Sequence, residues 1–137
     1  MGIYLDSKTA YILYKGETQN PYFVDKSQIL EELFPLVSRG NSHICITRPR
    51  RFGKTVMANM IAAYFSKGCD ANDIFENLAI AKSPEYETFR NKFSVIHISF
   101  NDTRRRCGSY EQYIEQIQNR LVRDLVKEYP EVELYDE

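Results

Sequence analysis

The sequence predicts an α/β fold in which helices flank a parallel sheet. Two segments, Ser42–Thr47 and Ser94–Phe100, have the apolar pattern of buried strands, and a helical pattern follows each of them. Strands that alternate with helices form parallel sheets with right-handed crossovers, which indicates this fold class. Sheets average about five or six strands, so two strands predict the N-terminal portion of a larger, incomplete domain.

Composition sets limits on the class of protein. The 137 residues are 43% hydrophobic and carry a net charge of −1, which fits one domain and gives no global sign of nucleic-acid or membrane binding. The three cysteines are widely spaced: Cys45, Cys69 and Cys107. An odd number without metal-site spacing argues for reduced thiols and a cytoplasmic protein. The sequence has neither a signal-peptide pattern nor an apolar run of the ~18 residues that span a bilayer.

Residues 1–41 are expected to form a helical lead-in. Residues 3–15 predict a short helix capped by Asp6 or Ser7, although their aromatic residues would also suit an edge strand. A polar loop over 16–21 and a short β-prone piece over 22–24 follow.

The second half of the lead-in predicts another helix. Residues 25–28 have the pattern of a capping box, in which Asp25 accepts from the first turn and Gln28 reaches back. One face of the helix is apolar, carrying Ile29, Leu30 and Leu33. Pro35 is expected to end or kink it, because proline removes a donor and clashes with the preceding turn.

Residues 42–137 are expected to supply the sheet and its covering helices. An apolar helix follows Lys54 and stops at Lys67-Gly68, and two short helices lie within 70–91. A loop over 101–108 leads to a capping box formed by Ser109 and Gln112. The long helix that it opens ends at Pro130 and carries an apolar stripe of Ile114, Ile117, Leu121 and Leu125.

The chemistry is expected at the turn between the first strand and the apolar helix. A phosphate-binding loop has the pattern Gly, four residues, Gly-Lys and Ser or Thr. Gly53-Lys54-Thr55 fits the second half, whereas Arg48 stands at the first glycine position. A solvated lysine at a helix start would oppose the helix dipole, so we assign Lys54 to phosphate. Thr55 is the candidate Mg²⁺ ligand rather than a simple cap.

The basic residues before Gly53 complete the predicted nucleotide site, which comprises Arg50, Arg51, Phe52, Gly53, Lys54 and Thr55. Three arginines beside Lys54 would repel one another without an anion, which favours anion binding by at least one of Arg48, Arg50 and Arg51. Phe52 suits a core wedge better than a base-stacking group.

Other residues near these segments are weaker candidates for a functional role. Phe23 and Val24 precede the loop by a helix, the position at which similar P-loop ATPases often place an adenine-contacting strand, and simple packing is at least as good an explanation. Asp102 follows the second strand but has the character of a turn former. His97 has no paired nucleophile nearby, which favours packing or edge exposure over catalysis.

Three stretches together resemble the predicted AAA-ATPase-like family of bacterial P-loop proteins: 22–27 (YFVDKS), 46–55 (ITRPRRFGKT) and 95–100 (VIHISF). Many members of that family carry a C-terminal PD-(D/E)XK nuclease-like domain. The resemblance covers most of residues 1–130 and implies a P-loop NTPase-like fold that uses ATP and Mg²⁺. In that family arginine already stands at the position of Arg48.

The resemblance also implies that residues 1–137 are the N-terminal part of the domain, with 1–41 as lead-in and 42–137 as nucleotide-binding segment. The acidic Walker B strand of the family would lie beyond residue 137. ATP hydrolysis is therefore expected only of a longer chain, and no residue here is predicted to be catalytic.

Two alternatives to an ATPase segment remain open from the sequence. Both arginine runs, with Arg104, Arg105 and Arg106 as the second, would suit a module that binds nucleic acid or an acidic protein surface. A domain that holds nucleotide only as a structural ligand is the other.

Overall fold

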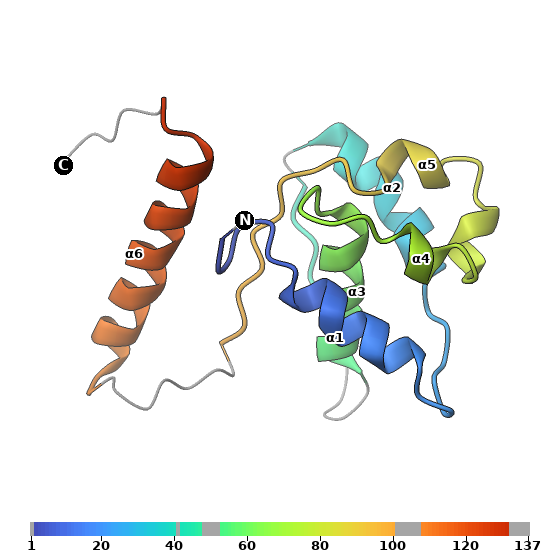
Figure 1. The fold of residues 1–137 in the computed structure, drawn as a ribbon, viewed down its shortest axis with the longest axis horizontal. Helices are drawn as coiled ribbons and strands as arrows, with labels where there is room; N and C mark the ends of the chain where they lie inside the picture. The colour runs from blue at the N-terminus through green and yellow to red at the C-terminus, as the bar shows by residue number, and fades with distance from the viewer. Residues whose placement is uncertain (1, 41, 48–52, 101–107, 132–137) are drawn as a thin grey trace.

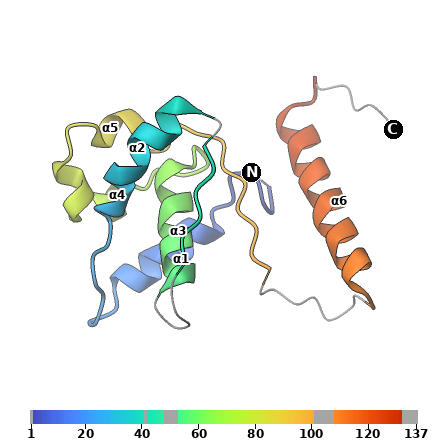
Figure 2. The same ribbon diagram turned by 180° about the vertical axis from the view of Figure 1, so that it is seen from behind.

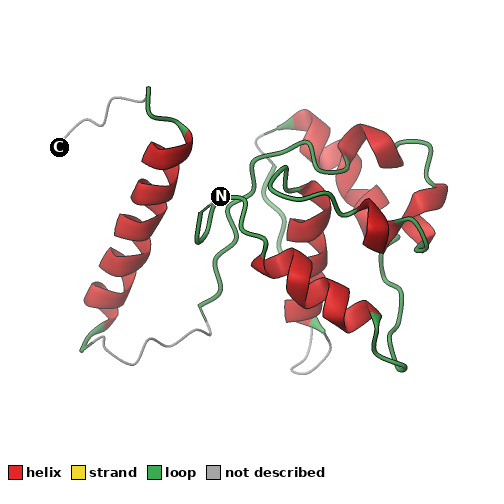
Figure 3. Ribbon diagram, viewed as in Figure 1, coloured by secondary structure: helices red, strands yellow, loops and turns green. Residues whose placement is uncertain are grey.

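The structure, a computed structural model, describes residues 2–40, 42–47, 53–100 and 108–131. Over these residues the chain consists of helices and loops (Figure 3). In chain order the helices are α1 (Thr9–Thr18), α2 (Ile29–Arg39), α3 (Lys54–Phe65), α4 (Asn72–Phe75), η1 (Ala79–Lys82), α5 (Tyr86–Phe89) and α6 (Tyr110–Glu128). Helices α1, α2, α4 and α5 gather around α3, while α6 stands apart (Figure 1). The view from behind shows the same arrangement (Figure 2).

The predicted α/β fold with a parallel sheet is wrong, because the described residues contain no β-strand. Segment 42–47 is exposed along its whole length, including Ile44 and Ile46. Segment 94–100 pairs only through an isolated antiparallel bridge between Leu5 and Ile96. Alternating apolar residues favour an extended backbone, but a sheet also requires a partner strand in register. The two predicted strands do not supply one another with that partner.

Helix α3 forms the centre of the hydrophobic core. Its residues Met60 and Tyr64 are 1% and 0% exposed. The Tyr64 ring meets Phe75 edge-on at a centroid distance of 5.3 Å, and its hydroxyl donates to the Tyr86 carbonyl at 2.7 Å. Phe34 from α2 stacks on the ring of Phe89 and is also fully buried. Burying a large side chain contributes about 1.5–3 kcal/mol, so this aromatic cluster fixes the position of α3.

Two helices end later than predicted. Helix α1 begins at Thr9 rather than near residue 3, so the predicted start is wrong, and it continues through Gly16 to Thr18, where the Thr18 hydroxyl donates to the Lys15 carbonyl at 2.7 Å. Helix α2 continues through Pro35 to Arg39. Proline removes one helical hydrogen bond, but Pro35 lies on the exposed face of α2, where water can satisfy the carbonyl left without its donor.

The predicted capping box at 25–28 is wrong. Asp25 accepts a hydrogen bond from Ser27 N at 2.8 Å and, with its other oxygen, from Ala79 N at 2.7 Å. The Ser27 hydroxyl accepts from Ile80 N at 3.1 Å. No side-chain bond caps the start of α2. These residues therefore fasten the segment before α2 to η1, a short helix that the sequence did not predict.

The cap of the last helix is confirmed. Ser109 Oγ accepts from Gln112 N at 3.3 Å, and the Gln112 side chain reaches back to Gly108 N at 2.9 Å. Ile117, which belongs to the predicted apolar stripe, is buried. Asp124, two helical turns further along α6, is also buried. The face of α6 that turns inward therefore contains a carboxylate as well as apolar side chains.

Asp124 meets the N-terminal arm, by which we mean residues 2–6. Its Oδ2 accepts from Tyr4 N at 2.7 Å and from Leu5 N at 3.3 Å. The other side of the arm pairs with the segment before α6, where His97 N donates to the Tyr4 carbonyl at 3.0 Å. The arm therefore lies between α6 and the helical body, as Figure 1 shows.

Candidate functional site

The start of α3 is the part of the predicted nucleotide site that the structure describes. Gly53 precedes the helix with φ 79° and ψ 26°, in the left-handed region that favours glycine. Its carbonyl accepts the first helical hydrogen bond, from Met57 N at 2.9 Å. The N–H groups of Lys54, Thr55 and Val56 find no acceptor among the described residues. They are the free donors of a helix N-terminus, which attracts anions.

No acidic group of the described residues offsets the positive end of α3. Its first turn contains no carboxylate, and no side chain caps it. The ion pairs of the described residues involve other cations, Lys15, Lys67 and Arg90. The ammonium group of Lys54 is therefore available to a bound anion.

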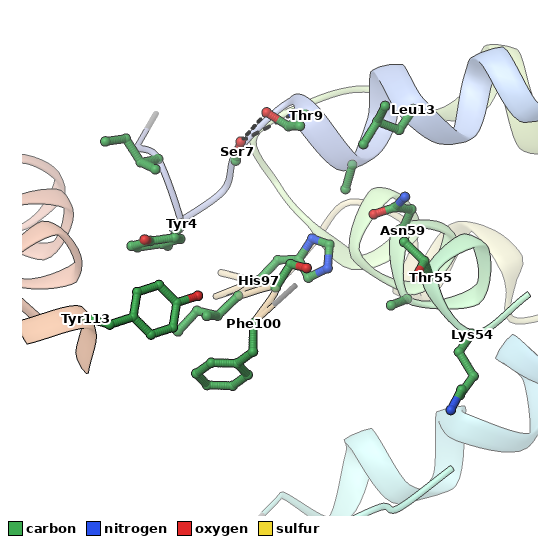
Figure 4. A pocket seen from close by; sticks show the side chains of 15 residues that line it. Tyr4, Ser7, Thr9, Leu13, Lys54, Thr55, Asn59, His97, Phe100 and Tyr113 are labelled. Atoms are coloured by element: carbon green, nitrogen blue, oxygen red, sulfur yellow. Dashed lines mark hydrogen bonds between the residues drawn. The ribbon is translucent and has the colours of Figure 1, made fainter. Parts of the chain in front are cut away.

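A cavity of about 530 Å³ opens beside Lys54 and Thr55. Figure 4 shows it between α1, α3, the segment 97–100 and the start of α6, with Lys54 at one end and Tyr113 at the other. Asn59, one turn beyond Thr55, also lines it and is 7% exposed. The hydroxyl of Thr55 has no hydrogen bond with the described residues. This end of the cavity thus combines a cation, a hydroxyl and an amide.

The opposite end of the cavity is aromatic. It is lined by Tyr4, His97, Phe100 and Tyr113. Burial lowers the pKa of His97 below its ordinary value, since desolvation disfavours the charged imidazole. The ring is therefore neutral at neutral pH, and the assignment of His97 to packing stays a prediction.

A second cavity, of about 230 Å³, lies on the Gly53 side of α3. Tyr22, Phe23 and Val24 line it, together with Lys26 and Glu17. Phe23 is the residue for which the sequence leaves adenine contact open, whereas no sequence pattern assigns a role to Lys26. A Cβ built at Gly53 would lie 3.5 Å from Lys26 Nζ. This proximity between residues 27 positions apart is a tertiary feature that no local pattern reveals.

The segment that carries Lys26 is held by polar contacts on both sides. Burial raises the pKa of Asp25, but hydrogen bonds from Ser27 and Ala79 outweigh that effect and keep its pKa below the ordinary value. Asp25 is therefore a carboxylate at neutral pH, the form that best accepts these bonds.

The remaining predicted site residues lie outside the described residues. They are Arg48, Arg50, Arg51, Phe52, Asp102, Arg104, Arg105 and Arg106. Their assignments stay predictions.

The described part of the chain contains no cluster of three or more metal-binding side chains. Cys45 and Cys69 are free thiols, and Cys107 lies outside that part. Among the described helices none combines the length and the hydropathy that crossing a bilayer requires.

Comparison with known proteins identifies a family. The family described as "Predicted AAA-ATPase" matches residues 14–136. No curated protein and no solved structure matches the chain. The family match confirms the resemblance seen in the sequence, and its range includes the start of α3 and the residues that line the second cavity.

Proposed function

Because the chain belongs to the predicted AAA-ATPase family over residues 14–136, we propose that it binds ATP at the start of α3. One observation carries the proposal. Left-handed Gly53 precedes a helix whose first N–H groups have no acceptor among the described residues and whose first two side chains, Lys54 and Thr55, line a cavity. These are the groups that hold a nucleoside triphosphate when a helix begins on Gly-Lys-Thr.

Each group has a separate role in the proposal. The free N–H groups of the first turn of α3 donate to phosphate oxygens, and the helix dipole contributes about 0.3–1 kcal/mol per charge. Lys54 contacts the β- and γ-phosphates. Thr55 would be the protein ligand of Mg²⁺, which commonly keeps several waters and needs few protein oxygens. The unpartnered Thr55 hydroxyl at the cavity fits that role, and the ion would neutralise phosphate charge.

The proposal concerns binding. Hydrolysis also needs a group that activates water, and we assign that role to none of the described residues. A domain that keeps ATP as a structural ligand would share the same contacts and would differ in showing no turnover.

Calorimetric titration of Mg-ATP into wild-type protein and the Lys54→Ala variant tests the proposal. The loss of a charge-assisted phosphate contact of about 1.5–3 kcal/mol predicts at least tenfold weaker binding. The matched control is Lys82→Ala, which removes an exposed lysine that lines neither cavity. Equal ATP affinity in wild-type protein and Lys54→Ala would contradict the proposal.

The Thr55→Ala variant distinguishes the contribution of Mg²⁺ coordination to ATP affinity from the contribution of phosphate contacts. If Thr55 ligates Mg²⁺, the variant binds ATP more weakly than wild type with Mg²⁺ present, and the two bind alike in excess EDTA. A basic module for nucleic acid or an acidic protein, the alternative from the arginine runs, predicts the reverse pattern. Its binding would weaken steeply with salt and would not respond to Lys54→Ala.

A further inference from the structure

We propose that Lys26 is a second phosphate-binding residue of this site. The inference rests on the proposed function and extends it to a residue outside the Gly-Lys-Thr motif. It is based on three consecutive residues. Asp25 and Ser27 accept hydrogen bonds from η1, and Lys26 between them lies near the start of α3.

The neighbours of Lys26 fix its backbone. Asp25 accepts hydrogen bonds from Ser27 N and Ala79 N, at 2.8 and 2.7 Å. Ser27 is 0% exposed, and its hydroxyl accepts from Ile80 N at 3.1 Å. Both bonds to η1 cross more than 50 residues of sequence. These anchors fix the backbone that carries Lys26, which lowers the entropic cost of presenting its side chain to a ligand.

The ammonium group of Lys26 lies beside Gly53, the residue before α3, and Lys26 lines the second cavity rather than the one lined by Lys54 and Thr55. It is 3.5 Å from the position that a Cβ would take at Gly53, an ordinary contact distance, so its charge lies next to the start of α3. Lys26 is exposed and forms no ion pair with the described residues. Glu17 lines the same cavity, yet no ion pair joins it to Lys26.

The positive charges of Lys26, Lys54 and the N-terminal end of α3 favour the binding of an anion between them. Lys26 and Lys54 both flank a helix end that is itself positive and has no acid in its first turn. Two ammonium groups and a helix dipole repel one another, and a polyphosphate placed among them removes that repulsion. A flexible lysine suits this role because it contacts phosphate as a point charge without fixed geometry.

The test compares Lys26→Met with Lys26→Arg by calorimetric titration of Mg-ATP and of inorganic triphosphate. Methionine keeps the apolar length of the side chain and removes the charge. We expect Lys26→Met to bind both ligands about tenfold to a hundredfold more weakly. Lys26→Arg should stay within about threefold of wild type. Lys82→Met is the matched control, and its affinities should not change.

Three results would overturn the inference. If Lys26→Met binds ATP as wild type does while Lys54→Ala does not, Lys26 has no part in a site that is otherwise as proposed. If Lys26→Met weakens ATP but not triphosphate, the contact is with the nucleoside. If the wild-type protein binds neither ligand, the proposed function fails and the inference fails with it. Thermal denaturation of Lys26→Met should match wild type, because the exposed side chain forms no ion pair with the described residues.

Discussion

The attachment of α6 gives the sharpest prediction about the fold. Asp124 Oδ2 holds the N-terminal arm through Tyr4 N at 2.7 Å and Leu5 N at 3.3 Å. Tyr4 and Leu5 are 7% and 3% exposed, so water cannot readily replace the carboxylate. Asp124→Ala should therefore leave two buried donors without this acceptor and loosen α6 from the arm.

The expected cost of Asp124→Ala follows from the lengths of its hydrogen bonds to Tyr4 N and Leu5 N. A hydrogen bond to a charged group contributes about 1.5–3 kcal/mol, and the longer bond to Leu5 contributes less than the shorter one to Tyr4. We expect Asp124→Ala to lower the free energy of opening by about 3 kcal/mol, which is roughly a hundredfold faster amide exchange in the arm. Asp124→Asn keeps an acceptor and should cost about half as much.

Hydrogen exchange followed by mass spectrometry measures this loss on peptides that cover residues 2–6 and 110–128. The matched control is Asp73→Ala. It also removes a carboxylate, but the Lys15–Asp73 pair at 2.8 Å is half-exposed on both sides and should contribute no more than about 1 kcal/mol. Equal exchange in wild type and Asp124→Ala, or equal effects of Asp124→Ala and Asp73→Ala, would refute the reasoning.

The same contact predicts a dependence on pH. Burial raises the pKa of Asp124, but backbone hydrogen bonds from Tyr4, Ile3 and Leu5 outweigh burial and keep the pKa below its ordinary value. A lowered pKa in the folded state stabilises the protein above the unfolded pKa of about 3.9. That stabilisation disappears as the pH falls through the folded pKa. The difference between wild type and Asp124→Asn should therefore shrink in acid, and a constant difference would contradict the assignment.

Three further substitutions test the packing by urea denaturation. Gly16→Ala should raise the free energy of unfolding by about 0.5–1 kcal/mol, since a Cβ there meets nothing within 4 Å and alanine favours helix; a loss would contradict the extension of α1. Gly68→Ala should lower it by about 1–3 kcal/mol, because the added Cβ would overlap the backbone oxygen of Asp6. Tyr64→Phe should lower it by about 0.5–1.5 kcal/mol, because the Tyr86 carbonyl loses the hydroxyl donor and keeps only Arg90 N; no change would show that water replaces the hydroxyl.

Local signals in the sequence predicted local structure well. Glycine before lysine and threonine marked the start of α3, and the apolar residues that follow form its buried length. Ser109 and Gln112 marked the start of α6 because a cap depends on residues within one turn. The same reasoning places the residues of the proposed nucleotide site at this helix start, since the motif and the start of α3 coincide.

Contacts between distant segments were not predictable in this way. Alternation over 42–47 and 94–100 indicated extended chain, but the bridge that Ile96 forms joins it to Leu5, 91 residues earlier. Asp25 had the spacing of a helix cap and instead bonds Ala79. A carboxylate satisfies whichever donors the fold brings to it, and local spacing cannot tell a cap from a tertiary contact.

The error at Asp25 bears directly on function. A capping box would have made residues 25–28 a feature of α2 alone, and Lys26 an ordinary exposed charge in its first turn. Because Asp25 and Ser27 bond to η1 instead, the segment is fixed against the body of the protein with Lys26 near Gly53. The same two hydrogen bonds that contradict the sequence prediction therefore hold the proposed second phosphate-binding lysine beside Gly53. If Asp25→Ala frees this segment, it should weaken Mg-ATP binding in the same direction as Lys26→Met although Asp25 itself carries a repelling charge, and tighter binding by Asp25→Ala would show that charge, rather than positioning, governs the site.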